Sequence, residues 1–184
     1  MCKMSAEAKE AGVARFLEKY PQAGRTDGTE HPALRGCNEI PWSELPGCTP
    51  EMPALLHALL DPVTAPEADS VLTTVLMSHM FLLSPATPAA LPFLLRLAAD
   101  PQVPARGDLL GFLAIAAELS RPLEPGQKGT LWGTDGDHPD HEQCRAAFAE
   151  HAHLVHALLN DETLPAGILT ADDRAALQLA AGQH

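Results

Sequence analysis

Leucine and alanine recur at helical spacing along most of this chain, and several of the segments that carry them open on Thr-Pro or Ala-Pro. The clearest pair is 87–100, TPAALPFLLRLAAD, followed directly by 103–120, VPARGDLLGFLAIAAELS. Apolar residues three and four positions apart form one buried face of a helix, and a proline in the first turn removes an N–H that has no helical partner. The pattern predicts an all-α fold, a short α-solenoid of about seven helices in antiparallel pairs.

Composition supports a helical chain with one core. Apolar residues make up 46% of the 184 positions and aromatic residues only 4%, with leucine and alanine dominating the apolar set. Because these two residues favour helices and strand-forming types are scarce, a β-rich fold is not expected. We expect an N-terminal helix and irregular loop over 1–48 and a helical repeat domain over 49–184, together forming one structural unit.

The chain is acidic, with 24 Asp and Glu against 12 Lys and Arg and a net charge of −12. Such a surface repels phosphate backbones and anionic lipid headgroups, so neither nucleic acid nor a membrane is an expected partner. No apolar run reaches the length of a membrane span, and the opening MCKMSAEAKE lacks the apolar core of a signal peptide. A cytoplasmic location is the expectation.

Local signals predict where the elements begin and end. Prolines, glycines and polar residues interrupt the periodicity over 21–50 and 121–139, and Trp42 and Leu45 are expected to attach the first of these irregular stretches to the core. The spacing of Thr170 and Asp173 predicts a capping box and a short closing helix. Elsewhere the apolar spacing predicts helices over 5–20, 49–60, 65–83, 87–100, 103–120 and 139–160.

Three stretches carry a family resemblance: IPWSEL at 40–45, PALLHALL at 53–60, and Ala86-Thr87 leading into LPFLL at 91–95. Over less than half of its length, the chain resembles bacterial HEAT-like repeat proteins of a type common in actinobacteria. The resemblance implies a helical repeat that binds other proteins, since most such proteins are scaffolds and a minority are enzymes. It also implies a place in natural product biosynthesis, where similar proteins occur as small components of specialised-metabolite pathways.

A histidine in the apolar part of this region is the first catalytic candidate. Relatives of this type often carry a polar motif with a histidine shortly before the Ala-Thr pair, and His79 holds that place here, although Met80 and Phe81 after it are apolar. A buried neutral histidine can act as a general base or pack in the core. Asp137 and His141 would supply further acid/base groups in a helix-lined pocket, so these three residues are the catalytic candidates.

Apolar residues outside the predicted core faces point to a partner. The stretch 70–83, SVLTTVLMSHMFLL, is apolar on nearly every side of the predicted helix, which therefore needs a cover from the core or from another protein. Tryptophan in a long loop is typical of binding hot spots. The candidate partner-binding residues are Met77, Met80, Phe81 and Trp132.

Histidines gather around Cys144 in the region 137–156, and His141 precedes that cysteine by three residues. Imidazole and thiolate are zinc ligands, but a second histidine pair lies too far along the predicted helix to share an ion with the first. No metal and no other cofactor is therefore expected. The four cysteines are expected to be reduced, and a Cys37–Cys48 disulfide across the irregular loop is the alternative.

These features favour a non-catalytic or accessory subunit that packs against a protein partner, as a heteromer or a homodimer. The resemblance implies that the partner is an enzyme of a specialised-metabolite pathway. The alternative is a small-molecule biosynthetic enzyme that uses acid/base residues in a helix-lined pocket and binds a small molecule there. The sequence leaves open whether the chain is an enzyme.

Overall fold

The computed structural model describes residues 6–23, 31–79, 82–122 and 139–182, and within them the chain is mostly helical. The all-α fold class is therefore confirmed. Among the described helices, none has both the length and the apolar character that crossing a bilayer requires. The α-helices are α1 (Ala6–Lys19), α2 (Met52–Ala58), α3 (Ala65–Leu76), α4 (Thr87–Ala99), α5 (Arg106–Leu119), α6 (Pro139–Glu150), α7 (Ala152–Leu159) and α8 (Ala171–Ala180).

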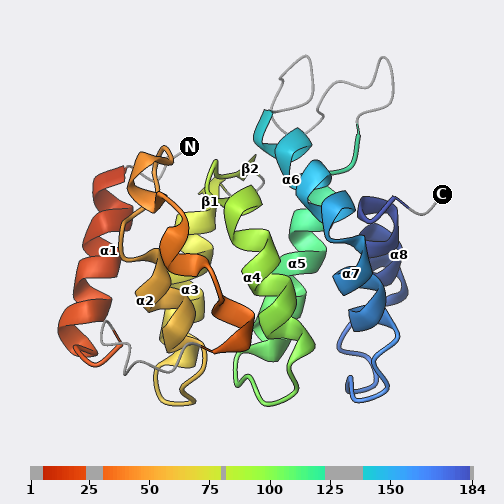
Figure 1. Cartoon of the computed structure of the whole chain (residues 1–184), viewed down its shortest axis with the longest axis horizontal. Coiled ribbons are helices and arrows are strands. Elements are labelled where there is room, and N and C mark those ends of the chain that lie inside the picture. Colours follow the sequence, from red (N-terminus) through yellow and green to blue (C-terminus); the bar gives the residue numbers. More distant parts are fainter. Residues whose placement is uncertain (1–5, 24–30, 80–81, 123–138, 183–184) are drawn as a thin grey trace.

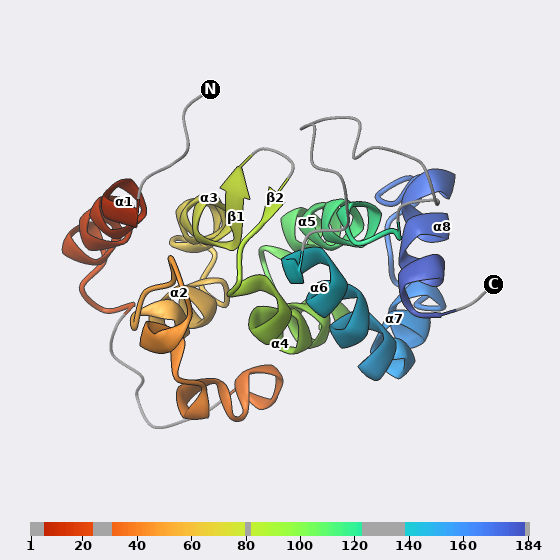
Figure 2. The same cartoon turned by 90° about the horizontal axis from the view of Figure 1, so that it is seen from above.

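The described helices lie in two rows (Figure 1 and Figure 2). One row contains α2, α4, α6 and α7, and the other contains α3, α5 and α8, with α1 packed beside α3 at the edge. Connections at the lower end of Figure 1 join α2 to α3, α4 to α5 and α7 to α8, so each of these pairs is antiparallel. Buried leucine, alanine and phenylalanine side chains fill the space between the rows and form one apolar cluster.

Several helices begin where the sequence predicts. Pro53, Pro66 and Pro88 lie in the first turns of α2, α3 and α4, where the fixed φ of proline suits a helix and the missing N–H has no consequence. At the start of α8, Thr170 Oγ1 accepts from the Asp173 N–H at 3.1 Å, and Asp173 Oδ2 accepts from the Thr170 N–H at 2.8 Å. The predicted capping box is confirmed.

The irregular stretch before α2 is attached to the core through Trp42, as expected. Its described part contains three single-turn 3₁₀ helices. The Trp42 side chain is buried, its Nε1 donates to the Cys37 carbonyl at 2.7 Å, and its ring centre lies 6.1 Å from that of Phe93 in α4. No disulfide joins Cys37 to Cys48. The 3₁₀ helices are η1 (Pro32–Leu34), η2 (Cys37–Glu39) and η3 (Trp42–Glu44).

The helix predicted over 65–83 is wrong beyond Leu76. After α3 the chain forms an antiparallel hairpin of two short strands, β1 (Met77–His79) and β2 (Leu82–Leu83), in which Met77 lies opposite Leu83 and His79 opposite Leu82. Met77 and His79 therefore belong to a strand. The helix with apolar residues on every side, which suggested a partner-binding surface, does not form.

Donors from outside α3 bind the carbonyl groups of its last turn. The Ser84 N–H and Thr87 Oγ1 both donate to the Leu76 carbonyl, at 2.8 and 2.6 Å, and Lys9 Nζ of α1 donates to the Val75 carbonyl at 2.8 Å. These donors take the places of the N–H groups that a continuing helix would supply. The helix therefore ends where these donors bind, although its local sequence favours a longer one.

The helix predicted over 139–160 changes direction at His151, which separates α6 from α7 and has φ −103° and ψ 24°. On the α6 side, Cys144 and Phe148 are buried, and that helix packs against α4 and α5. On the α7 side, Val155 and Leu158 are buried, and that helix packs against α4 and α8. Both helices therefore pack against α4, while α6 adds α5 and α7 adds α8 as a second neighbour.

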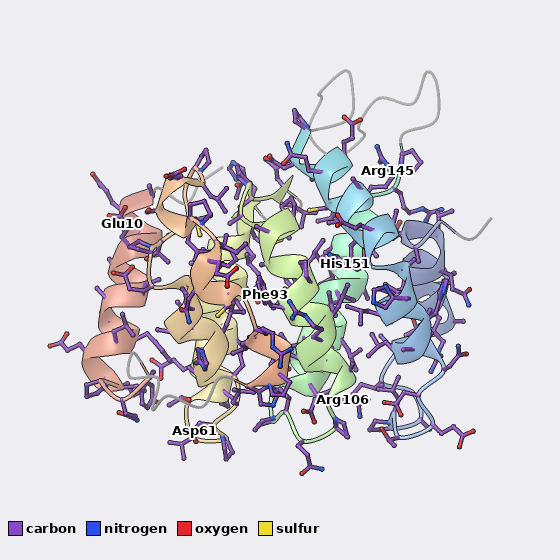
Figure 3. The ribbon with its side chains drawn as sticks, in the orientation of Figure 1. Glu10, Asp61, Phe93, Arg106, Arg145 and His151 are labelled. Carbon is purple, nitrogen blue, oxygen red and sulfur yellow. The ribbon has the colours of Figure 1, made fainter. Side chains whose placement is uncertain are left out.

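Basic side chains bind the carbonyl groups at the ends of four helices. Each donor comes from another helix and brings positive charge to the negative end of the helix dipole. Figure 3 shows two of them, Arg106 and Arg145, at opposite ends of the molecule. The donor and acceptor residues are Lys9 with Val75, Arg106 with Ala98, Arg145 with Ser120 and Arg174 with Leu159, at distances of 2.7 to 3.0 Å.

Arg106 makes the most connections of this group. Its side chain is nearly buried at the start of α5 and donates to the Ala98 carbonyl at the end of α4. It also forms an ion pair with Asp161 and donates to Thr163 Oγ1 at 3.1 Å, both in the connection between α7 and α8. One guanidinium therefore joins two helix pairs.

We expect Arg106→Met to lower the free energy of unfolding by about 2–4 kcal/mol, because the Ala98 carbonyl and the Asp161 carboxylate lose a charged donor. Urea denaturation followed by circular dichroism measures this change. Arg121→Met is the matched control, since Arg121 is exposed and its ion pair with Glu118 lies on the surface; its effect should stay under about 0.5 kcal/mol. Equal losses in the two variants would contradict the role given to Arg106.

Candidate functional site

Two of the three catalytic candidates, His79 and His141, lie on the β1–β2 hairpin and on the helix that packs against its second strand. His79 is partly buried on β1, and His141 lies in the first turn of α6, which packs against β2. His141 Nε2 accepts a hydrogen bond from the Leu83 N–H at 3.4 Å. This hydrogen bond attaches α6 to the hairpin.

The other residues selected from the sequence divide into two groups. Met77 is partly buried and packs against the core, so it offers little surface to a partner. The rest lie outside the described residues, and their roles stay predictions: Asp137 among the catalytic candidates, and Met80, Phe81 and Trp132 among the partner-binding ones.

The cysteine of the histidine-rich region is poorly suited to bind a metal. Cys144 is fully buried on α6, and burial, together with the nearby Asp140, raises the pKa of its thiol to about 12. A thiol with this pKa stays protonated near neutral pH, whereas metals bind the thiolate. Within the ranges that the structure describes, no group of three or more His, Cys, Asp or Glu side chains is placed to hold an ion.

A surface that the sequence analysis did not single out lies on the outward side of α5 (Figure 2). Ile115 is 53% exposed there, and it and Val63 are the large apolar side chains that stand out as exposed among the described residues. The helical period shows which residues share a face of α5, but it does not show which face a neighbour covers. The exposed residues of this side are Gly107, Asp108, Gly111, Ile115 and Glu118.

Gly111 lies one turn before Ile115 on this side of α5, and the fold itself does not require a glycine there. Its φ is not positive, and a Cβ at this position would meet nothing within 4 Å in the described structure. Glycine inside a helix lowers stability by about 0.5–1 kcal/mol relative to alanine, but it also lets another backbone approach closely. The contacts among the described residues give no reason for this loss of helix stability.

A groove of about 690 Å³ runs between α5 and α8, next to these residues. Its lining combines small apolar side chains with carboxylates, and it is open along one side. Together with Gly111 and Ile115, its lining residues form what we call the α5–α8 surface. The lining residues are Ala114, Glu118, Arg121, Asp172, Asp173, Ala175, Ala176, Gln178 and Leu179.

At the start of α5, Asp108 of this outward side lies near a carboxylate of α3. Asp69 of α3 is partly buried and makes no hydrogen bond or ion pair within the described part of the chain. Burial, and then repulsion by Asp108 of α5, raises the pKa of Asp69 to about 6. Negative charge at this position is therefore unfavourable in the folded chain.

No family model, no curated protein and no solved structure matches this chain. The resemblance to bacterial HEAT-like repeat proteins therefore stays a prediction from the motifs at 40–45, 53–60 and 86–95.

We expect Asp69→Asn to raise the free energy of unfolding near pH 7.5 by about 1 kcal/mol. The rise of the pKa to about 6 corresponds to a free-energy penalty of about 3 kcal/mol for the charged carboxylate. Solvent screening reduces this penalty, because the carboxylate is only partly buried. The pKa is higher in the folded than in the unfolded chain, so wild-type stability falls as pH rises from about 4 to about 6. Below about pH 4 both states are protonated, and the difference between variant and wild type should shrink.

Urea denaturation at a series of pH values tests this dependence. Asp108→Asn is the companion variant: it removes the repulsion but keeps the burial of Asp69, so it should recover only part of the stabilisation. A difference between Asp69→Asn and wild type that does not change with pH would contradict the explanation.

Proposed function

We propose that this chain is a HEAT-like α-solenoid that acts as a non-catalytic or accessory subunit and packs against a protein partner. The arrangement of antiparallel helix pairs in two rows supports this, because such arrays present long continuous surfaces along each row. The family resemblance is the ground for placing the partner among the enzymes of specialised metabolism.

The outward side of α5 is the single observation that carries the proposal. Ile115 is a large apolar side chain left in solvent in the middle of a helix whose other apolar residues are largely buried. Gly111 beside it lowers helix stability without serving a contact within the described chain. A second chain that packs on this side of α5 would bury Ile115 and occupy the space beside Gly111.

The alternative, a small-molecule biosynthetic enzyme, has less support. Of its three catalytic candidates, His141 uses Nε2 to bind the backbone of β2. Among the described candidates, neither His79 nor His141 lines the groove between α5 and α8.

The proposal is tested by cross-linking the full chain in the cells that encode it, identifying the protein captured, and measuring its affinity for the purified chain. Ile115→Lys should weaken binding at least about ten-fold, because it places a charge in an apolar contact. Val63→Lys is the matched control: Val63 is equally apolar and 71% exposed, but lies in the connection between α2 and α3, away from the α5–α8 surface.

Two results would contradict this function. One is a purified monomer that turns over a small molecule and loses that activity, but not its fold, on His79→Ala. The other is a partner whose affinity falls equally in the Ile115 and Val63 variants.

A further inference from the structure

We propose that the α5–α8 surface binds a basic amphipathic helix of the partner protein. This inference rests on the proposed protein-binding function and adds the chemistry of the bound segment. The peptide selection described below distinguishes such a helix from an acidic or uncharged segment and from an extended strand.

The shape of the surface suits a helix. α5 and α8 lie side by side along the groove (Figure 2), and the side chains at its base are small. Ala114, Ala175 and Ala176 line it, and Gly111 extends the same small surface by one turn, so a third backbone can approach closely. Ile115 and Leu179 are the larger apolar contacts for residues spaced at i, i+3 and i+4 on the incoming helix.

The charge of the surface selects a basic partner. Three carboxylates line the groove against one arginine, and that arginine already forms an ion pair with Glu118. Asp108 adds an exposed carboxylate on α5, and Asp69 lies beside it. Lysine or arginine side chains flanking an apolar stripe would therefore meet opposite charge along the edges of the groove. The carboxylates of the lining are Glu118, Asp172 and Asp173.

This excess of negative charge follows from how the chain uses its cations. Four of its basic residues bind carbonyl groups at helix ends, so they do not neutralise carboxylates on the outer faces of α5 and α8. A phosphate backbone would be repelled there.

The binding helix can be sought without knowing the partner. A display library of random peptides of about 20 residues, long enough for a helix that spans α5, is selected on the immobilised full chain. Binders to the Ile115→Lys variant are removed in a counter-selection. We expect the enriched peptides to carry an apolar stripe at helical spacing with lysine or arginine on both sides. Their affinity should fall several-fold when NaCl is raised from about 0.05 to about 0.5 M.

Two glycine variants then separate binding from folding. Gly111→Ala and Gly12→Ala both replace a helical glycine whose added Cβ would meet nothing within 4 Å, the second of them on α1. Both should therefore raise the thermal midpoint of unfolding. Only Gly111→Ala should weaken binding of a synthetic enriched peptide, by about ten-fold, measured by fluorescence anisotropy. A loss of binding in a stabilised protein cannot come from misfolding.

Several results would overturn the inference. They are the absence of any enriched peptide, enrichment of acidic, uncharged or extended peptides, and equal binding by wild type and the Gly111 variant. These failures are distinct from a failure of the proposed function, which the cross-linking experiment decides. If cross-linking identifies a partner that depends on Ile115 but contacts the surface through another kind of segment, the function holds and this inference is wrong.

Discussion

The carbonyl groups at the ends of the helices need donors, and the arrangement of this molecule depends on basic side chains that supply them from other helices. Lys9 reaches a carbonyl 66 positions away and thereby joins α1 to the end of α3. Arg106, Arg145 and Arg174 do the same for α4, α5 and α7. Because a buried carbonyl without a donor costs about 1–3 kcal/mol, each of these links favours the observed packing over an alternative docking of the same helices.

The same use of cations affects the surface. The chain has twice as many acidic as basic residues. Several of its basic side chains bind carbonyl groups at helix ends, so fewer of them lie beside surface carboxylates. The carboxylates of α5 and α8 then face solvent around Ile115 and a groove of small side chains. The hydrogen bonds at the helix ends thus affect which partner the surface favours, because a basic segment reduces the repulsion between the carboxylates of α5 and α8.

Helix starts were predictable from the sequence, whereas two helix ends were not. The prolines that begin α3 and α4, and the capping box of Thr170 and Asp173, act within one turn, so neighbouring residues are sufficient to recognise them. The start of α2 was placed three residues too early, since this helix begins at Met52. The end of α3 at Leu76 depends on Lys9 and Thr87, which are distant in sequence or beyond the helix. Apolar spacing continues past Leu76, and nothing local marks the change to a hairpin.

For the candidate site, the sequence by itself determined the apolar faces of the helices, the acidic charge and the unusual place of His79 in an apolar stretch. Only the tertiary structure brought His141 to the hairpin and left Ile115 uncovered beside α8. The reason is physical: the helical period fixes which side chains share a face, whereas burial of that face depends on which other helix packs there. In this chain that choice depends on the hydrogen-bond donors that bind the helix ends from other helices.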